Sequence, residues 1–412
     1  MEWTIVGIDW GSRVHSACVM DGEGSVVGEW EFEHSGEAIA GCVDKLIELA
    51  GDASCLRVAI EIPHGAVVEA LLDRGVKVFS INPKQLDRFR DRHSVAGAKD
   101  DDLDAYVLAD SLRTDTKLYR PVELPDAGLV ELRDISRLYD SLTEQVVALA
   151  NQVQAQLQRY YVQLRDLGRW HEEPWLWDLF DAAPTPKKLE TLRQSDLKAI
   201  LKSHRIRRYK PLPLLEALQG QKALVVAPGV AEGASARIAM VLPVLRAAHQ
   251  QRRACEKRIE SLLKRPSPEG EEETHRDAEI LLSLPGLGNR TGATMLAEAP
   301  IALQRRDYQD LRRLCGAAPV STRTGGKRKK PSVAMRRACN MRLRNALHHW
   351  ANRATQVDER ARRHYVQLRS KGHSHGRALR GVGDRLLKVL VVMLHTGSLF
   401  DPELRNPKAE AA

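Results

Sequence analysis

The first 118 residues alternate strand patterns with helix patterns, and this order restricts the possible folds more than any other feature. The opening "WTIVGIDWGSRVHSACVMDGEGSVVGEWEFEH" predicts three strands, because "MDGEG" supplies the residues that a tight hairpin turn needs. "EAIAGCVDKLIELA" and "GAVVEALLDRG" have apolar residues at helical spacing, whereas "CLRVAIEIP" and "VKVFSIN" are typical of buried strands. Residues 1–120 are therefore expected to form an α/β domain.

The pattern changes to helix from about residue 127. Apolar residues recur at steps of three and four, which predicts a coiled-coil-like seam suited to a hairpin or to oligomerisation. They are Ile135, Tyr139, Leu142, Val146, Leu149, Val153, Leu157, Tyr160 and Leu164. A second helical stretch, roughly 233–265, could pair with the first. We expect a helical linker over residues 121–270, a mainly α C-terminal domain over 271–395 and a disordered tail over 396–412.

Composition narrows the class of protein and its partners. The chain has 412 residues, a hydrophobic fraction of 43% and no apolar run near the roughly 18 residues that a bilayer span needs. Its six cysteines include no CxxC pair, which favours reduced thiols in the cytoplasm over a disulfide framework or a zinc site. The net charge is +9, and Arg and Lys crowd residues 305–385. Clustered basic charge indicates a nucleic-acid partner, although solvated helix faces can also be arginine-rich.

Carboxylates occur where an α/β domain does not ordinarily place them. Asp9 lies within the apolar "IVGIDWGS" and Glu61 ends the strand "VAIEIP". A buried unpaired carboxylate is costly, so these two should bind a cation or lie at a rim. "AKDDDLDAYVLADSL" then begins a helix, on which Asp104 shares a face with Asp101 or with Asp100. The helix macrodipole alone would also favour acids there. Together they predict a site for one or two Mg²⁺ ions, in a ribonuclease-H-like arrangement for phosphoryl transfer.

The C-terminal region contains two candidate nucleic-acid contacts. "LLSLPGLGNRTGATMLAEA" has the form of a helix-hairpin-helix, whose turn would bind a DNA phosphate, with an ordinary αα-hairpin as the alternative. "STRTGGKRKK" is a phosphate-binding turn, or else one of its hydroxyls is a nucleophile, although no base lies near it in sequence. The candidate nucleic-acid-binding residues are Gly286, Gly288, Asn289, Arg290, Arg323, Gly325, Gly326, Lys327, Arg328, Lys329, Arg336, Arg337, Arg342 and Arg344.

Several motifs occur together in a characteristic order. "GIDWGS", "AIEIP" and "AKDDDLDAYVLAD" precede the seam, and "LPGLGNRTGATMLAE" and "GAAPVSTRTGGK…MRRACNMRLRNALHHWANRA" follow it. From residue 5 to about 360 the chain resembles the DEDD transposases of the IS-one-ten/IS-eleven-eleven insertion sequences, relatives of the Piv and MooV invertases. The resemblance implies a RuvC-like N-terminal domain, a coiled-coil linker and a C-terminal transposase domain.

The resemblance also implies a set of site residues. The metal-binding tetrad falls on Asp9, Glu61, Asp101 and Asp104, because the family spacing after Lys99 selects Asp101 over Asp100. Family members use a serine nucleophile, but Thr324 occupies that position here. Threonine can also attack, Ser321 is the nearby alternative, and an inactive copy is a third possibility.

From the resemblance we expect a bacterial, Mg²⁺-dependent recombinase that acts on donor and target DNA in the cytoplasm, at the nucleoid. A covalent 5′-phosphate intermediate, a structured guide ("bridge") RNA and a dimer to tetramer are implied as well. One alternative is a metal-dependent junction-resolving nuclease that uses water. Another is a catalytically inactive nucleic-acid-binding relative.

Overall fold

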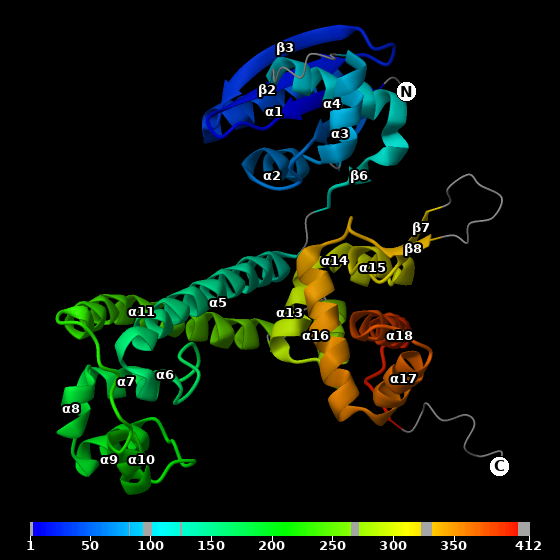
Figure 1. Cartoon of the computed structure of the whole chain (residues 1–412). Coiled ribbons are helices and arrows are strands. Elements are labelled where there is room, and N and C mark those ends of the chain that lie inside the picture. Colours follow the sequence, from blue (N-terminus) through cyan, green and yellow to red (C-terminus); the bar gives the residue numbers. More distant parts are fainter. Residues whose placement is uncertain are drawn as a thin grey trace, which may run out of the picture. The chain divides into compact units, whose positions relative to one another are not determined.

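A computed structural model describes residues 3–81, 83–93, 101–123, 126–264, 272–322 and 332–402 of the chain. The chain divides into two compact units, Met1–Asp126 and Ala127–Ala412, and each is described by itself (Figure 1). The expected domain boundaries near residues 120, 270 and 395 remain predictions. Part of the expected tail, residues 403–412, lies outside the described residues.

The first unit is built on a six-stranded sheet with the strand order β3-β2-β1-β4-β5-β6. Strands β1, β2 and β3 are antiparallel neighbours, β4 and β5 run parallel to β1, and β6 is antiparallel to β5. Their bounds are β1 Thr4–Asp9, β2 Val14–Met20, β3 Val26–Glu33, β4 Leu56–Ile60, β5 Lys77–Ser80 and β6 Arg120–Pro121. The sheet is mixed, and the predicted three-strand opening is confirmed.

Helices cover both faces of this sheet. Helices α1 (Gly36–Ala50) and α2 (Ala66–Asp73) share one hydrophobic cluster with Val6 and Ile8 of β1. Helices α3 (Pro83–His93) and α4 (Asp101–Asp115) share another cluster with Ile5, on the opposite face. Odd-numbered residues of β1 therefore face α3 and α4, because successive strand side chains point to opposite faces. Short 3₁₀ turns occupy Ala53–Cys55 and Thr116–Leu118.

The ends of α1 follow directly from its sequence. The Ser35 hydroxyl accepts a hydrogen bond from the Ala38 backbone N–H, which satisfies one of the free amides at the helix start. Gly51 ends the helix in the left-handed region at φ 74°, where a residue without Cβ avoids strain. The predicted helix over this segment is confirmed.

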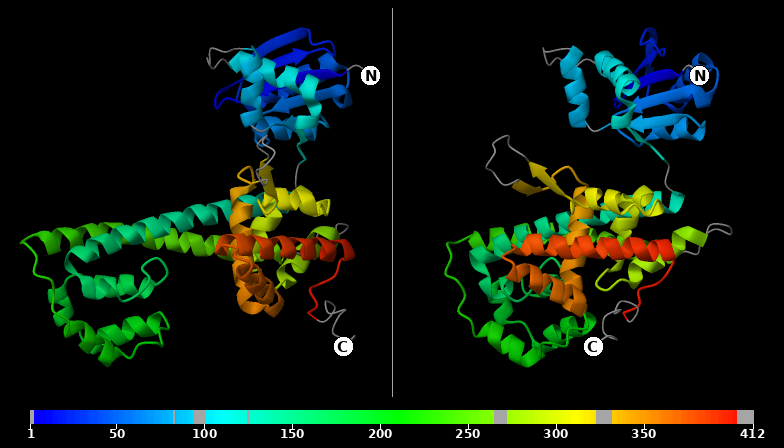
Figure 2. Two further views of the ribbon diagram at one scale, coloured as in Figure 1. Left: turned by 45° about the vertical axis from the view of Figure 1, so that its right-hand side comes forward. Right: turned by 90° about the vertical axis from the view of Figure 1, so that its right-hand side faces the viewer.

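Two long helices, α5 (Ala127–Tyr160) and α11 (Val230–Leu263), lie side by side in the second unit (Figure 2). Most residues of the predicted seam are buried in α5, among them Tyr139, Val146 and Leu157. The expected pairing of the two helical stretches within one chain is confirmed, although five shorter helices and not a tight turn connect them. Coiled-coil packing and a role in oligomerisation stay predictions.

The segment between these helices folds into five shorter ones. They are α6 Val162–Arg165, α7 Pro174–Ala182, α8 Pro186–Glu190, α9 Gln194–Ser203 and α10 Pro211–Gln219. Trp170, Trp175, Trp177 and Phe180 are fully buried and form one cluster with the facing sides of α5 and α11. The aromatic residues that interrupt the helical pattern of the sequence thus supply the core of this part of the molecule.

Over residues 272–322 and 332–402, the described remainder of the second unit is helical except for one hairpin. The helices are α12 Glu272–Ser283, α13 Asn289–Glu298, α14 Pro300–Gln304, α15 Tyr308–Leu314, α16 Met341–Val357, α17 Glu359–Ser370 and α18 His375–Thr396. Strands β7 (Pro319–Thr322) and β8 (Ser332–Met335) pair antiparallel and depart from the helical expectation. Each strand has four residues, too few for period-two alternation to be recognised in a basic sequence. Each strand depends on a partner that lies outside its own four residues.

Candidate active site and nucleic-acid interface

Asp9 and Glu61 lie at the same edge of the sheet. Asp9 is the last residue of β1, and Glu61 directly follows β4, which is parallel to β1 and adjacent to it. The last paired residues of the two strands are Ile8 and Ile60, and each acid directly follows one of them. Continuing the strand alternation by one residue places both on the face covered by α3 and α4. The sheet therefore brings together two acids that are 52 positions apart in sequence.

Helix α4 packs on β1 with direct contact between backbones. A Cβ at Gly7 would lie 1.9 Å from the carbonyl oxygen of Ala105 and 2.6 Å from the backbone nitrogen of Ala109. Only glycine permits this approach, because the helix backbone occupies the space of a side chain. Asp104 directly precedes Ala105, so the same packing places this residue on the part of α4 that lies against β1.

Asp104 is buried, at 7% exposure, and is paired with an arginine that our sequence analysis did not single out. Arg90, on α3, donates from Nε to Oδ1 of Asp104 over 2.5 Å and from a terminal nitrogen to Asp87 over 2.9 Å. The hydrogen bond to Asp104 raises the pKa of Arg90, and the negative charge of Glu61 adds to that effect. One guanidinium therefore faces the negative field of both acids. In the sequence, the only sign that Arg90 binds a carboxylate was its i, i+3 spacing from Asp87.

The carboxylates of Asp9, Glu61 and Asp104 are chemically suited to bind a hard divalent cation. Carboxylate oxygens are the donors that Mg²⁺ prefers, and Arg90 shows that a positive charge is favoured at Asp104. Within the described side chains, no three His, Cys, Asp or Glu residues group so that they could hold an ion. Asp101 begins α4, but its side chain, like all of Asp100, lies outside the described residues.

A histidine pair holds the turn that follows Asp9. Nδ1 of His15 accepts a hydrogen bond from the Gly11 backbone N–H over 3.3 Å, and its Nε2 lies 2.9 Å from Nδ1 of His34. A backbone amide can only donate, so the proton of neutral His15 is on Nε2 and is donated to His34. Burial lowers the pKa of His15, and the neighbouring His34 lowers it further. The buried His15, hydrogen-bonded to His34, thus fixes the backbone next to the candidate metal ligand.

The candidate nucleophile belongs to the connection between β7 and β8. Thr324 lies outside the described residues, together with Arg323, Gly325, Gly326, Lys327, Arg328 and Lys329. Ser321 is placed in β7, opposite Val333 of β8, but its side chain is not described. Ser321 thus belongs to the hairpin itself, and Thr324 to the sequence between its two strands.

The predicted helix-hairpin-helix lies over α12, the turn and α13. Gly286 has φ +79°, and a Cβ there would lie 2.6 Å from the backbone nitrogen of Ala354 on α16. The first glycine of the turn thus packs against protein, whereas Gly288 is exposed and precedes α13, which begins at Asn289. Arg290 is exposed, and its guanidinium donates to the Tyr139 hydroxyl and lies over that ring.

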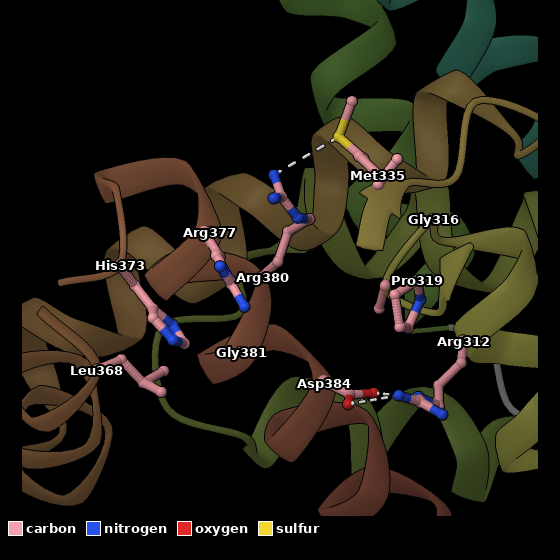
Figure 3. A pocket seen from close by; sticks show the side chains of 12 residues that line it. Arg312, Gly316, Pro319, Met335, Leu368, His373, Arg377, Arg380, Gly381 and Asp384 are labelled. Atoms are coloured by element: carbon pink, nitrogen blue, oxygen red, sulfur yellow. Dashed lines mark hydrogen bonds and ion pairs between the residues drawn. The ribbon is translucent and has the colours of Figure 1, made fainter. Parts of the chain in front are cut away.

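The other candidate arginines have different surroundings. Arg342 binds Glu298, and it donates to Asp140 over 2.9 Å and to Ser136 over 2.7 Å, so its guanidinium joins an ion network of the protein. Arg337 is exposed, Arg336 is half-buried and Arg344 lies against Gly316. Arg377 and Arg380 of α18, which were not among the predicted residues, line a pocket beside this region (Figure 3). Their i, i+3 spacing in "HGRALRG" could have indicated from the sequence that the two arginines share one helix face.

Comparison with known proteins agrees with the resemblance of the motifs. Residues 6–162 match the profile of a family described as Transposase, and residues 278–366 match the Transposase IS116/IS110/IS902 family. The mini-circle putative transposase for IS117 of Streptomyces coelicolor is 32% identical over 413 aligned positions, which cover 96% of this chain and 95% of that protein. The chain belongs to this family of transposases. The resemblance predicted from the motifs is confirmed, and so is its class as an enzyme, a DNA transposase.

Two further relatives are similar over different lengths. Putative transposase y4uE of Sinorhizobium fredii is 42% identical over 229 residues, which cover 55% of this chain and 62% of that protein. A 43.6 kDa protein of insertion element IS110 from S. coelicolor is 26% identical over 408 residues, 97% of this chain and 96% of the relative. A DEDD transposase domain suggests a ribonuclease-H-like fold, with which the mixed sheet of the first unit is consistent. None of the described helices of the transposase has the length and apolar character to cross a membrane.

Proposed function

We propose that this transposase cleaves and exchanges DNA strands of an insertion sequence with the help of Mg²⁺ held by Asp9, Glu61, Asp101 and Asp104. The observation that carries the proposal is the sheet edge, where Asp9 and Glu61 end adjacent parallel strands on the face covered by α4. The buried Asp104 and its partner Arg90 belong to the same face. When bound, one or two Mg²⁺ ions would polarise the scissile phosphate and lower the pKa of the attacking hydroxyl.

The chain's own residues then have distinct roles. The hydroxyl oxygen of Thr324 forms a bond to the scissile phosphorus, and the bond from that phosphorus to the 3′ oxygen breaks. The hydroxyl loses its proton to water, and the departing oxygen gains one. A 3′ hydroxyl of the partner DNA next attacks the same phosphorus and releases Thr324. Transesterification of this kind keeps the energy of the phosphodiester, which hydrolysis would lose.

The resemblance extends the proposal to guidance and assembly. A structured guide RNA that pairs with donor and target DNA would supply sequence specificity, and a dimer to tetramer would hold two duplexes. The basic residues of the second unit favour nucleic-acid binding. Purification from cells that carry the DNA next to the gene, followed by sequencing of the bound RNA, tests the guide. Recovery of no specific transcript would remove it from the proposal.

Cleavage of DNA that carries the element's ends, measured in Mg²⁺ and in EDTA, tests the metal site. We expect Asp9→Asn, Glu61→Gln and Asp104→Asn each to lower the cleavage rate by about 100-fold or more, because each would remove an ion ligand. Asp44→Asn is the matched control, since Asp44 is an exposed acid of α1 that pairs with Arg74 on the opposite face of the sheet. Cleavage that persists in EDTA would contradict the proposal, and no cleavage in either would favour an inactive nucleic-acid-binding relative.

The nucleophile is tested by trapping covalent protein–DNA adducts. We expect adducts with the unmodified enzyme and with Ser321→Ala, and none with Thr324→Ala. Adducts that persist in Thr324→Ala and vanish in Ser321→Ala would transfer the role to Ser321. Metal-dependent cleavage without any adduct would favour a nuclease that uses water.

A further inference from the structure

A small cavity of about 270 Å³ opens beside the β7–β8 hairpin in the second unit (Figure 3). Pro319 of β7 and Met335 of β8 line one side of it, and Arg377 and Arg380 of α18 line another. The volume lies just below the roughly 300–1,000 Å³ of small-molecule sites. It suits one group that projects from a larger ligand.

The cavity carries uncompensated positive charge. Its acid, Asp384, accepts hydrogen bonds from Arg312 over 2.6 Å and from the Tyr308 hydroxyl over 3.0 Å. The charge of Asp384 is therefore balanced by that of Arg312. Arg380 donates to the thioether sulfur of Met335 over 3.5 Å, a weak acceptor. No carboxylate of the described residues forms an ion pair with Arg377 or with Arg380, which leaves two cations at one cavity.

Several neighbouring groups increase this charge. Arg380 is half-buried, and burial together with the charges of Arg344 and Arg377 lowers its pKa. Helix α18 begins at His375 and has no acid in its first turn, so both arginines lie near the positive end of a 22-residue helix. Cations are disfavoured at that end of a helix. The positive charges of Arg344, Arg377 and Arg380 therefore repel one another unless an anion lies between them.

A buried polar atom of the cavity also lacks a partner. Nδ1 of His373 is shielded from solvent and has no hydrogen-bond partner among the described residues, and His373 lines the cavity. An orphaned buried nitrogen of this kind is costly unless a ligand satisfies it. The sequence that joins β7 to β8, "RTGGKRKKP", contains no Asp or Glu, so the hairpin itself supplies no anion.

We propose that this cavity binds one phosphodiester group of a DNA strand, with Arg377 and Arg380 on the phosphate oxygens and His373 as a further hydrogen-bond partner. The inference rests on the proposed function for the identity of the ligand. Guanidinium groups suit phosphate because their N–H groups form a fork that matches two oxygens. Met335, Leu368 and Pro319 would contact the adjoining sugar. The cavity lies at the end of the hairpin where Pro319 pairs with Met335, so the bound strand would run beside β7 and β8.

Binding of a labelled DNA duplex to the full chain, measured by fluorescence anisotropy in EDTA over a range of salt, tests the cavity. We expect Arg377→Gln with Arg380→Gln to lower the affinity roughly tenfold or more and the salt slope by about 2, one for each guanidinium that no longer neutralises phosphate charge. The control, Arg353→Gln with Arg363→Gln, removes the same charge from exposed positions of α16 and α17 and should change the affinity less than about threefold.

A second variant addresses the cavity without removing its arginines. Ala334→Glu adds a carboxylate at an exposed lining position and should lower the DNA affinity as the double variant does, with an unchanged melting temperature. The proposal is overturned if the double variant binds like its control, or if it loses affinity for RNA but not for DNA. Binding in EDTA reports on the cavity and cleavage in Mg²⁺ reports on the metal site, so failure of the one and failure of the other give different results.

Discussion

Glu298 is a buried carboxylate that connects three helices of the second unit. Its side chain is 4% exposed and accepts hydrogen bonds from Arg137, from Asn340 and from Arg342. Burial acts to raise the pKa of Glu298, but these donors and the charge of Arg137 outweigh it and lower the pKa to about 2. A single carboxylate thus fixes α5, α13 and the start of α16 in one arrangement.

At this residue we expect Glu298→Gln to lower the free energy of unfolding by about 2 kcal/mol or more at neutral pH, since the change removes the buried charge to which Arg137, Asn340 and Arg342 donate. The folded pKa lies below the ordinary 4.5, so the stabilisation is complete above that pH and is lost as pH falls toward 2. Urea unfolding at several pH values measures both effects. Asp140→Asn is the control, because this acid pairs with the same Arg342 at 52% exposure and should cost less than about 1 kcal/mol. Equal losses in the two variants would contradict the assignment.

At the scale of an element, the contact of α4 with β1 depends on one missing side chain. Gly7→Ala should lower the free energy of unfolding of the first unit by about 2 kcal/mol or more, because the new Cβ would overlap the backbone of α4. The same substitution at Gly41, an exposed position of α1 with open space around it, should stabilise by about 0.5–1 kcal/mol. Thermal unfolding of both variants provides the comparison. A tolerated Gly7→Ala would show that α4 can move away from the strand and would weaken the placement of Asp104.

The contact of α11 with α7 depends on a buried neutral imidazole. His249 is 7% exposed and meets the Trp177 ring edge-on, with ring centres 5.2 Å apart. Burial, helped by the charges of Arg252 and Arg253, lowers the pKa of His249 to about 4. The unfolded chain binds a proton at about pH 6.5, so this histidine destabilises the fold as pH falls from 6.5 toward 4.

We therefore expect His249→Phe to flatten the pH dependence of stability over that range by about 2–3 kcal/mol relative to the unmodified protein, since phenylalanine keeps a ring against Trp177 and does not titrate. Urea unfolding at pH 7 and near pH 4.5 measures the difference. An identical pH dependence in the two proteins would mean that His249 is already accessible to protons in the fold.

At the scale of the whole molecule, the two units have separate hydrophobic cores. Each described cluster belongs either to Met1–Asp126 or to Ala127–Ala412. We expect calorimetry to resolve two transitions, with Gly7→Ala shifting one and Glu298→Gln the other, because distant substitutions without shared contacts act independently. A single transition that both substitutions shift would show that the units unfold together.

Much of this architecture follows from patterns that are local in the chain. The strand and helix order of residues 4–80, the long helices near 127 and 230, and the helix start at Asn289 were predictable, because turn residues and apolar spacing act over a few residues. Strands β7 and β8 were missed, because their stability comes from each other. Helix α3 was also missed, and with it Arg90, whose importance depends on a carboxylate fourteen positions away.

The sequence by itself determined the family, the α/β class of the first unit and the carboxylates that make up the candidate metal site, since motifs and apolar periods are written in the order of residues. Only the tertiary structure decided which charges meet. Parallel pairing of β1 with β4 brings Asp9 and Glu61 to one edge, and the absence of a side chain at Gly7 lets α4 hold Asp104 there. Folding likewise commits Arg342 to Glu298 but leaves Arg377 and Arg380 facing a cavity. The physical reason is that charge interactions depend on distance in space, which apolar spacing along the chain does not encode.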